Sequence, residues 1–559
     1  MICSPLAKSA FDWATLHQDR PASVYPLTYK NNPSRVLRYA NRAFAILERI
    51  SSHKTGMCLL VMALTMATRI ALLPRIPIRQ PFIGDEFSYL LGAETFASGR
   101  LTNPMHPLWV HFEALHELMR PTYMSKYPPG QALFLAMGWK LLGHPWYGVW
   151  ISFGLFSACL CWMLQQWVPP VYAVLGTAIT LSQISVLTYW MNSYWGGAVA
   201  AGAGCLLLGS LPRLARRVRS RDAVVVAIGL LLLANTRPYE GLVMAGAAFL
   251  ALLFWRARRQ RGLVKLFSPR VVIPLVLVLG AGAFWTGYYN YRVTGNPVLM
   301  PYSVYARDYH IAPTWIFLPA RNPPVYRHVD LEKAWKADLE HYQKIRSNPL
   351  LNLTELHHAL GFYCSPLLSF PVALGILLSG SRRFWTAAAI CICLWCGLLI
   401  ESADKFPHYI APGVGLLPLL AVYGFRLLRV IGRSYGPILV LTLATFLCIQ
   451  GASASRGHGL ERIWETERQP PRITVMRELM NQGGRHLILV RFSADHIQWN
   501  NEPVYNSADI DASQIVWAHD MGEAKNRELF DYYRGSRKIW LYQPDTEPNT
   551  LVPYESVSR

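Results

Sequence analysis

Long apolar blocks recur along this chain, and arginine-rich clusters separate them. Many blocks approach the ~20 residues that an α-helix needs to cross the hydrocarbon core of a membrane. Only 16% of the 559 residues are charged, whereas soluble domains carry about 25%. We therefore predict an all-α polytopic membrane protein. About eleven spans are expected, near residues 56–74, 145–164, 170–189, 195–212, 222–236, 238–255, 271–289, 360–380, 384–401, 407–425 and 436–454.

The basic residues predict the orientation of these spans. They gather before the first span and in short clusters such as Arg213–Arg221 and Arg256–Arg261. Arginine-rich loops stay on the cytoplasmic side, so we expect a cytoplasmic N-terminus. The net charge of +21 is explained by this placement. A basic surface for nucleic acid is not indicated, because the charges lie between apolar blocks rather than on one face.

With this orientation, the unusual polar and aromatic segments all lie on the outer face. The longest are the outer loops 75–144 and 290–359. Residues 131–143 are apolar but too short to span, so we interpret them as a re-entrant or interfacial helix. The aromatic, proline-rich loop 290–359 is expected to cover a site, because loops of this length are often lids or binding elements.

The chain divides into a cytoplasmic segment (1–55), a membrane domain (56–454) and a soluble outer domain (455–559). The last part alternates predicted strands and helices, which indicates a small α/β domain. The strands are expected at 486–492, 514–520 and 537–545, and the helices at 472–482 and 526–535. We find no catalytic set there and expect a docking or acceptor-facing role.

Adjacent carboxylates, Asp85 and Glu86, follow the first span. Such a pair at the membrane surface suits a general base, a metal ligand or both. The alternative is structural, because acidic residues also stabilise the first turn of a helix. An amphipathic helix lying along the interface is expected directly after them.

The same loop carries His106, His111, Glu113 and His116. Glu113 and His116 would share one face of a helix, which suits a shared metal ion. A helix with an aromatic membrane face explains the pattern equally well. Lys126 and Tyr127 follow, beside a double proline that fixes a rigid turn. They suit a phosphate ligand or a loop anchor.

Two further segments place charges at the outer ends of spans. Arg237 and Glu240 lie between two apolar blocks, where charges are usually paired or functional. Lys405, His408 and Tyr409 lie where another span begins. A lysine and a histidine there suit a lipid phosphate, through charge-assisted hydrogen bonds worth roughly 1.5–3 kcal/mol each. The alternative is a lysine that extends to the interface within an aromatic belt.

Together these motifs resemble the GT-C superfamily of membrane glycosyltransferases. The strings GDEFSYL, GRLTNP, SKYPPGQ, RPYEG and KFPHYIAP carry the resemblance, which covers residues 56–454. The chain is similar to protein O-mannosyltransferases and aminoarabinose-type lipid A transferases, in a bacterial branch. The resemblance implies that Asp85 is the general base, that Glu86 positions it, and that Lys405, with His408 or Tyr409, holds the phosphate of a polyprenyl-phosphate sugar.

The predicted function is thus inverting transfer of a sugar to a lipid, glycan or protein acceptor at the periplasmic face of a bacterial inner membrane. Arg237 would assist at the phosphate, and Lys126, Tyr127, Glu240, His111 and Glu113 are further candidates for substrate binding. The use of a divalent metal stays open, because it varies within the superfamily. The alternative is a lipid-linked glycan transporter or a non-enzymatic component of an envelope complex.

Overall fold

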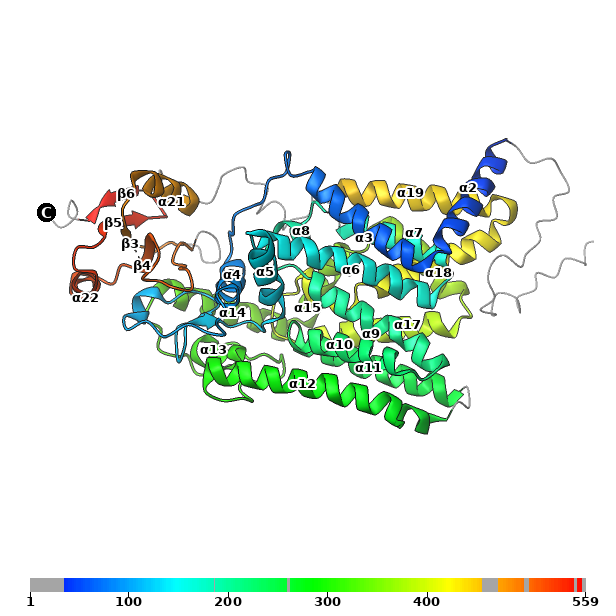
Figure 1. Ribbon diagram of the computed structural model, residues 1–559, viewed down its shortest axis with the longest axis horizontal. Helices are drawn as coiled ribbons and strands as arrows, with labels where there is room; N and C mark the ends of the chain where they lie inside the picture. The colour runs from blue at the N-terminus through cyan, green and yellow to red at the C-terminus, as the bar shows by residue number, and fades with distance from the viewer. Residues whose placement is uncertain are drawn as a thin grey trace, which may run out of the picture.

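A computed structural model describes residues 35–184, 186–258, 262–454, 471–496, 502–546 and 550–554. The predicted cytoplasmic segment therefore lies outside the described residues up to position 34, as does the start of the predicted outer domain at 455–470. A long helical bundle occupies one end of the molecule and a small sheet the other (Figure 1). Shorter helices of the two large outer loops lie between them.

Seven helices of the described chain are long and apolar enough to cross a membrane, or eight if one bent pair forms a single span. The protein is therefore an integral membrane protein. The seven comprise α3 (Lys54–Ala71), α6 (Trp146–Trp167), α9 (Ala198–Arg216), α11 (Pro238–Arg258), α12 (Pro269–Thr294), Ala411–Ile431 with α18 (Leu416–Ile431), and Arg433–Ser453 with α19 (Gly436–Ala454).

Shorter helices occupy the other predicted spans. These are α7 (Pro170–Ile184), α10 (Ser220–Ala234), α16 (Pro366–Leu378) and α17 (Arg382–Leu398). The prediction near 360–380 differs most from the structure, because α15 (Pro349–Gly361) and α16 meet at a bend of 103°. Ser365 caps the start of α16 and Pro366 occupies its first turn, a sequence that begins a new helix rather than continuing the old one.

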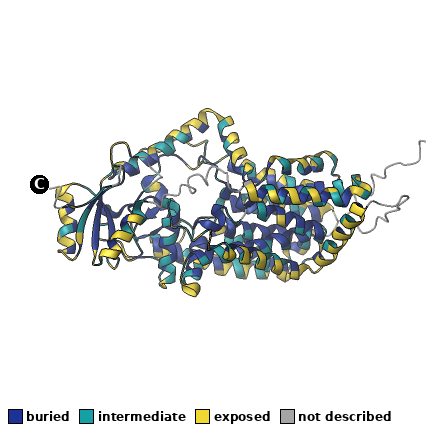
Figure 2. Cartoon of the chain, turned by 90° about the horizontal axis from the view of Figure 1, so that it is seen from above, coloured by how far each residue is buried: buried dark blue, intermediate teal, exposed yellow. Residues whose placement is uncertain are grey.

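The surface of the bundle is apolar where it would face lipid. Only 17% of the apolar window of α3 and 11% of that of α12 are buried within the protein, against 89% for α9. Exposed side chains accordingly follow the outer helices, and buried ones fill the interior (Figure 2). Leu277 and Phe284 of α12 are among the exposed apolar side chains. Lipid rather than protein would cover them, since apolar helix faces are stable there.

An amphipathic helix that the sequence analysis did not predict precedes the first span. Helix α2 (Arg35–Ser51) buries Leu37 and Phe44, and the Phe44 ring packs edge-to-face on Tyr172. Arg35, Arg38, Arg42 and Arg49 are exposed, together with apolar side chains such as Ile46. This pattern is typical of a helix lying on an anionic membrane surface.

The first outer loop contains a helix at the predicted position, α4 (Gly84–Ala97), and a short helix, α5 (Gly130–Leu142), over the predicted interfacial segment. The prediction that α4 is amphipathic and lies along the interface is wrong: none of its residues is exposed, because the helix packs within the protein. The second helix expected around His106–His116 is absent from the structure. That segment contains only a 3-10 turn (Trp109–Phe112), and the two-stranded ladder β1 (Glu117–Leu118) with β2 (Met124–Ser125) follows it. Its helical spacing is broken where His116 adopts a left-handed backbone, with φ of 69°.

The outer segment 290–359 is more regular than a covering loop. It contains α13 (Pro301–Tyr309), α14 (Val329–Ser347) and α15, and a short 3-10 turn, Pro407–Tyr409, lies at a neighbouring outer boundary. Val304, Tyr305 and Trp335 of this segment share one buried apolar cluster with Leu118 and Met124 of the first outer loop. The two large outer loops therefore pack on each other.

The C-terminal domain forms one four-stranded sheet in the order β4-β3-β5-β6. Its strands are β3 (His486–Val490), β4 (Ile515–His519), β5 (Lys538–Gln543) and β6 (Thr550–Pro553), with helices α21 (Pro471–Gln482) and α22 (Glu523–Tyr533). β3 pairs in parallel with β4 and β5, while β6 is antiparallel to β5. The three predicted strands and both helices are confirmed; β6 was not predicted.

This sheet domain packs directly on the first outer loop. Leu91, Phe112 and Tyr123 of that loop form one buried cluster with Leu487 and Val516 of the sheet. The Tyr123 hydroxyl also donates to the Asn506 carbonyl at 3.0 Å. Burial of apolar side chains contributes about 25 cal/mol for each Å² removed from water, so this shared core fixes the sheet domain over the loop.

Candidate active site

Asp85 lies in the first turn of α4 and faces the turn that contains Tyr127. The Tyr127 hydroxyl donates to Asp85 Oδ1, and His116 Nε2 lies 3.8 Å from Oδ2. The Tyr127 ring stacks on Tyr89, one turn further along α4, with centroids 4.5 Å apart. The Asp85 side chain is 25% exposed, which leaves it accessible to a substrate while its orientation is fixed by Tyr127.

Glu86 is directed away from this face and holds the start of α4 in place. Its Oε2 accepts backbone N–H groups of Phe82 at 2.9 Å and Ile83 at 3.4 Å, and its Oε1 accepts from Tyr194 at 3.1 Å. Burial raises the pKa of Glu86 to about 7, and these hydrogen bonds act against the rise. The geometry agrees with a positioning role and with the structural alternative of helix capping.

Lys126 is enclosed by aromatic rings. Its Nζ lies 4.7 Å from the ring centroid of Tyr305, 5.0 Å from Tyr127, 5.3 Å from Tyr302 and 5.7 Å from Trp335. The side chain is 4% exposed. Among the described residues, Nζ forms cation–π contacts only, without a hydrogen bond or an ion pair. A buried ammonium with unused donors is suited to bind an anion.

Arg237 occupies the short turn between α10 and α11. Its guanidinium lies 4.5 Å from the centroid of the Tyr409 ring and 3.6 Å from Glu240 Oε1. The first outer loop reaches this turn through Gly130, whose N–H donates to the Asn235 carbonyl at 2.7 Å. A Cβ at Gly130 would lie 2.5 Å from that carbonyl oxygen, so the close approach requires glycine there.

Asp85 is electrostatically coupled to both cations. Burial raises the pKa of the Asp85 carboxyl, and Lys126, the Tyr127 hydrogen bond and Arg237 oppose that rise. Burial likewise lowers the pKa of Lys126 to about 8, and Asp85 opposes that change. A carboxyl with a raised pKa is better matched to accepting a proton near neutral pH than an ordinary surface aspartate.

Lys405 Nζ has hydrogen-bond partners within the protein that the sequence did not predict. Its Nζ donates to the carbonyl oxygens of Glu401 at 2.8 Å and Ala403 at 2.5 Å. Burial lowers the pKa of Lys405, and Glu401 and Glu355 act in the opposite direction. Two of its three N–H donors are therefore satisfied by its own loop.

His408 is buried among aromatic rings behind Tyr409. Its ring lies 4.5 Å from Trp195 and 4.8 Å from Tyr409, and its Nδ1 is 3.3 Å from the Tyr189 hydroxyl. Burial lowers the pKa of His408 well below its usual range, and Arg237 adds to the effect. His408 is thus neutral. Its ring packs against Tyr409, and the Tyr409 ring contacts the Arg237 guanidinium.

The metal pair considered for Glu113 and His116 does not form. His116 turns toward Asp85, whereas Glu113 Oε1 accepts from Tyr309 at 2.8 Å and from Arg327 at 3.3 Å. The helix that would have aligned the two side chains is absent. His111 lies beside the sheet domain and is 2% exposed. Burial lowers its pKa.

Several residues around this site were not predicted. Tyr302 and Tyr305 of α13 and Trp335 of α14 complete the enclosure around Lys126. The aromatic content of segment 290–359 indicated a covering element, but its spacing did not show which rings would meet Lys126. Tyr89 was also missed, although it lies one helical turn from Asp85.

The sheet domain reaches the site as well. Tyr505 stacks on Phe87 of α4 with ring centroids 4.2 Å apart and an angle of 7° between the rings. A Cβ at Gly84 would lie 2.5 Å from the Tyr505 hydroxyl oxygen. The C-terminal domain therefore contacts the residue next to Asp85.

Comparison with solved structures finds similar chains of known fold. ArnT from Cupriavidus metallidurans, solved with bound undecaprenyl phosphate, is 12% identical with a TM-score of 0.49, and the match covers 86% of this chain and 92% of that one. The Archaeoglobus fulgidus oligosaccharyltransferase in its apo form is 11% identical with a TM-score of 0.40. Both enzymes are members of the GT-C superfamily.

This chain spans 62% of the length of that oligosaccharyltransferase, and the match covers 79% of this chain. A second structure, AglB from the same organism with an inhibitory peptide and a dolichol-phosphate, is 12% identical with a TM-score of 0.40, over 88% of this chain and 69% of that one. No protein-family model matches the sequence, and no curated protein matches it. The function of this chain must therefore be sought in its own residues.

Proposed function

We propose that this protein is a membrane glycosyltransferase that moves a sugar from a polyprenyl-phosphate donor to an acceptor hydroxyl on the outer face of the membrane. One observation carries the proposal. A half-buried carboxylate, Asp85, lies at the outer end of the bundle among aromatic rings and interacts electrostatically with a buried cation, Lys126, and a half-buried one, Arg237. This set suits proton abstraction beside a phosphate leaving group.

In the proposed reaction, Asp85 takes the proton of the acceptor hydroxyl. The hydroxyl oxygen forms a bond to the anomeric carbon of the sugar as the bond from that carbon to the phosphate oxygen breaks. The electron pair leaves with the polyprenyl phosphate, and the glycosylated acceptor is the second product. A single displacement of this kind inverts the configuration at the anomeric carbon. The motif around Asp85 resembles that of the GT-C superfamily, which supports this assignment.

Lys126 and Arg237 would bind the donor phosphate. Lys126 has unused N–H donors, and Arg237 offers a planar guanidinium suited to phosphate oxygens. Both would stabilise the charge that grows on the leaving phosphate. We assign Lys405 a supporting role instead, because its ammonium already donates to the Glu401 and Ala403 carbonyls. His408 and Tyr409 would hold Arg237 in place through ring packing.

The arrangement of the chain in the cell is part of the same proposal. The arginine clusters favour a cytoplasmic N-terminus, which places Asp85 and the sheet domain on the periplasmic side of a bacterial inner membrane. The sheet domain, residues 455–559, contacts α4 through Tyr505. We propose that it forms one wall of the acceptor entrance. The acceptor is a lipid, glycan or protein that carries a hydroxyl.

The test uses membranes containing the wild-type protein or Asp85→Asn, supplied with labelled polyprenyl-phosphate sugars and host acceptors. Asparagine keeps an oxygen for the Tyr127 hydroxyl, so the variant should fold and bind donor normally. Loss of a positioned base lowers the rate by about 10²- to 10⁴-fold. Asp308→Asn is the matched control, because that outer carboxylate of α13 pairs with Arg307 instead.

Transfer of label by wild type and Asp308→Asn, but not by Asp85→Asn, is the expected result. Full transfer by Asp85→Asn would contradict the role of Asp85 as base. Movement of the labelled lipid across proteoliposomes without formation of any covalent product would instead favour a lipid-linked glycan transporter.

A further inference from the structure

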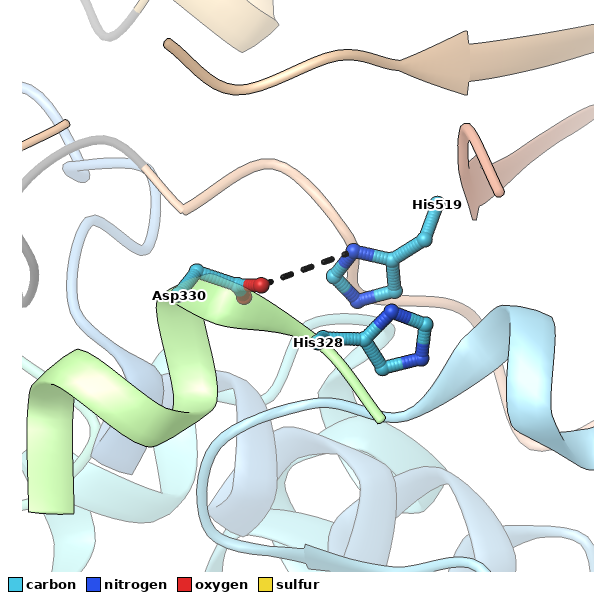
Figure 3. A group of neighbouring side chains, drawn as sticks. All are labelled: His328, Asp330 and His519. Atoms are coloured by element: carbon cyan, nitrogen blue, oxygen red, sulfur yellow. Dashed lines mark ion pairs between the residues drawn. The ribbon is translucent and has the colours of Figure 1, made fainter. Parts of the chain in front are cut away.

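Two histidines and an aspartate meet at the junction between the sheet domain and segment 290–359. Figure 3 shows His328 and Asp330 at the start of α14 and His519 opposite them. His519 is the last residue of β4, so the group joins two parts of the chain that are far apart in sequence. One ligand atom from each side chain lies within 4.8 Å of the others.

The two imidazoles are oriented by backbone carbonyls. His328 Nε2 lies 2.7 Å from the Val110 carbonyl oxygen, and His519 Nε2 lies 2.7 Å from the Glu113 carbonyl oxygen. Because a carbonyl only accepts, Nε2 of each ring must carry the proton, and the lone pair is then on Nδ1. Histidines that bind metals commonly donate their other N–H to a carbonyl in this way.

The rest of the geometry also suits a cation. His519 Nδ1 lies 3.9 Å from Asp330 Oδ1, a separation too long for a hydrogen bond. Tetrahedral zinc with bonds of about 2.0–2.1 Å separates its ligands by about 3.3 Å, so the three ligand atoms, which lie within 4.8 Å of one another, would draw together on binding the ion. The histidine rings stack with centroids 3.9 Å apart, so the two imidazoles lie face to face in this group (Figure 3).

All three side chains of this group are buried. The three side chains are 7%, 5% and 3% exposed for His328, Asp330 and His519. Neutral imidazoles and a carboxylate are the forms that coordinate a divalent ion.

We propose that His328, Asp330 and His519 bind one divalent transition metal of the zinc class, with a solvent oxygen completing the coordination. The ion would fasten the sheet domain to the start of α14. Since α14 also carries Trp335 of the Lys126 enclosure, the metal would hold that wall in position. The role is structural and does not depend on the proposed transfer reaction.

A second group, His341, Glu355 and Asp404, also has spacing compatible with a metal. This group contains one histidine. His341 Nε2 lies 3.6 Å from Glu355 Oε2 and 3.0 Å from Asp404 Oδ1, which is the geometry of an ion pair. The Asp404 side chain is 59% exposed. This group therefore serves as the matched comparison rather than as the proposed site.

The experiment uses the full chain in detergent, stripped with a chelator, reloaded with Zn²⁺ alone and desalted before elemental analysis. Wild type is expected to retain about one equivalent of zinc, and Asp330→Asn and His519→Ala should lose it. His341→Ala should retain it. Zinc should also raise the Tm of wild type and His341→Ala but not that of Asp330→Asn.

Replacement of zinc by Co²⁺ gives an independent readout that needs no variant. Wild type should show the intense visible absorption of tetrahedral cobalt with nitrogen ligands. Failure of wild type to retain zinc, or equal retention by wild type and Asp330→Asn, would overturn the proposal. Loss from His341→Ala alone would assign the metal to the other group. If every variant loses zinc, absence of tetrahedral cobalt bands in wild type overturns the proposal and their presence supports it.

Discussion

Lys126 offers the sharpest test of the proposed binding of the donor phosphate. The ammonium is 4% exposed, and burial lowers its pKa to about 8. It must be protonated to hold the donor phosphate, so kcat/KM should fall about tenfold per pH unit above pH 8. The donor phosphodiester stays singly ionised in this range, so the alkaline limb reports the enzyme. In the donor complex the bound anion raises the pKa of Lys126, which moves the limb of kcat to higher pH.

Replacement of Lys126 by methionine and by arginine separates charge from shape. A charge-assisted hydrogen bond is worth about 1.5–3 kcal/mol, so Lys126→Met should lower kcat/KM by about 10- to 150-fold at pH 7. The guanidinium of Lys126→Arg stays protonated at every accessible pH. That variant should keep part of the activity and lose the alkaline limb near pH 8.

The assay is initial transfer rate from a labelled polyprenyl-phosphate sugar between pH 5 and 10, with stability monitored at each pH. The acid limb should lie above pH 4, because burial raises the pKa of Asp85 and the reactive form is the carboxylate, which is lost as the pH falls. An alkaline limb near pH 8 that persists unchanged in Lys126→Arg would refute the reasoning, because another group would then be titrating.

Three further changes test the surroundings. Gly84→Ala should reduce activity and cost about 1–3 kcal/mol of stability, because its Cβ would meet the Tyr505 hydroxyl at 2.5 Å; adding Tyr505→Phe should restore both, and no recovery of Tm would contradict the contact. Glu86→Gln should lower the unfolding free energy by about 1–3 kcal/mol, because an amide has one acceptor oxygen and its N–H₂ cannot accept, so the bonds to the start of α4 and to Tyr194 cannot both be kept; an unchanged thermal unfolding curve would count against the capping role. Arg237→Met should raise the donor Kd by about 10- to 150-fold, measured by binding of polyprenyl phosphate, and Arg237→Lys should lose less; equal affinity in all three proteins would remove Arg237 from the phosphate site.

The sequence alone determined the class of the protein and the position of most of its apolar helices and of three strands of the sheet. The thickness of the hydrocarbon core sets the length of an apolar block that spans it, and arginines gather in the loops on the cytoplasmic side. The block lengths and the arginines in each loop can therefore be read directly from the sequence. Helix α4 follows from an acidic first turn, and the sheet domain follows from local alternation. Asp85 could be singled out because adjacent charges at the end of a span are rarely incidental.

Tertiary structure decided which of the outer residues meet. The residues next to Lys126 and Lys405 in the sequence do not show which ammonium has unused N–H donors. The first outer loop, which contains Lys126, is held beside Arg237 by the bond from the Gly130 N–H to the Asn235 carbonyl, whereas Lys405 donates to carbonyls of its own loop. Likewise, His519 joins His328 only because the sheet domain packs on the outer loops. Periodicity shows which face of an element is buried, but the partner of that face depends on long-range packing and on the direction of each side chain.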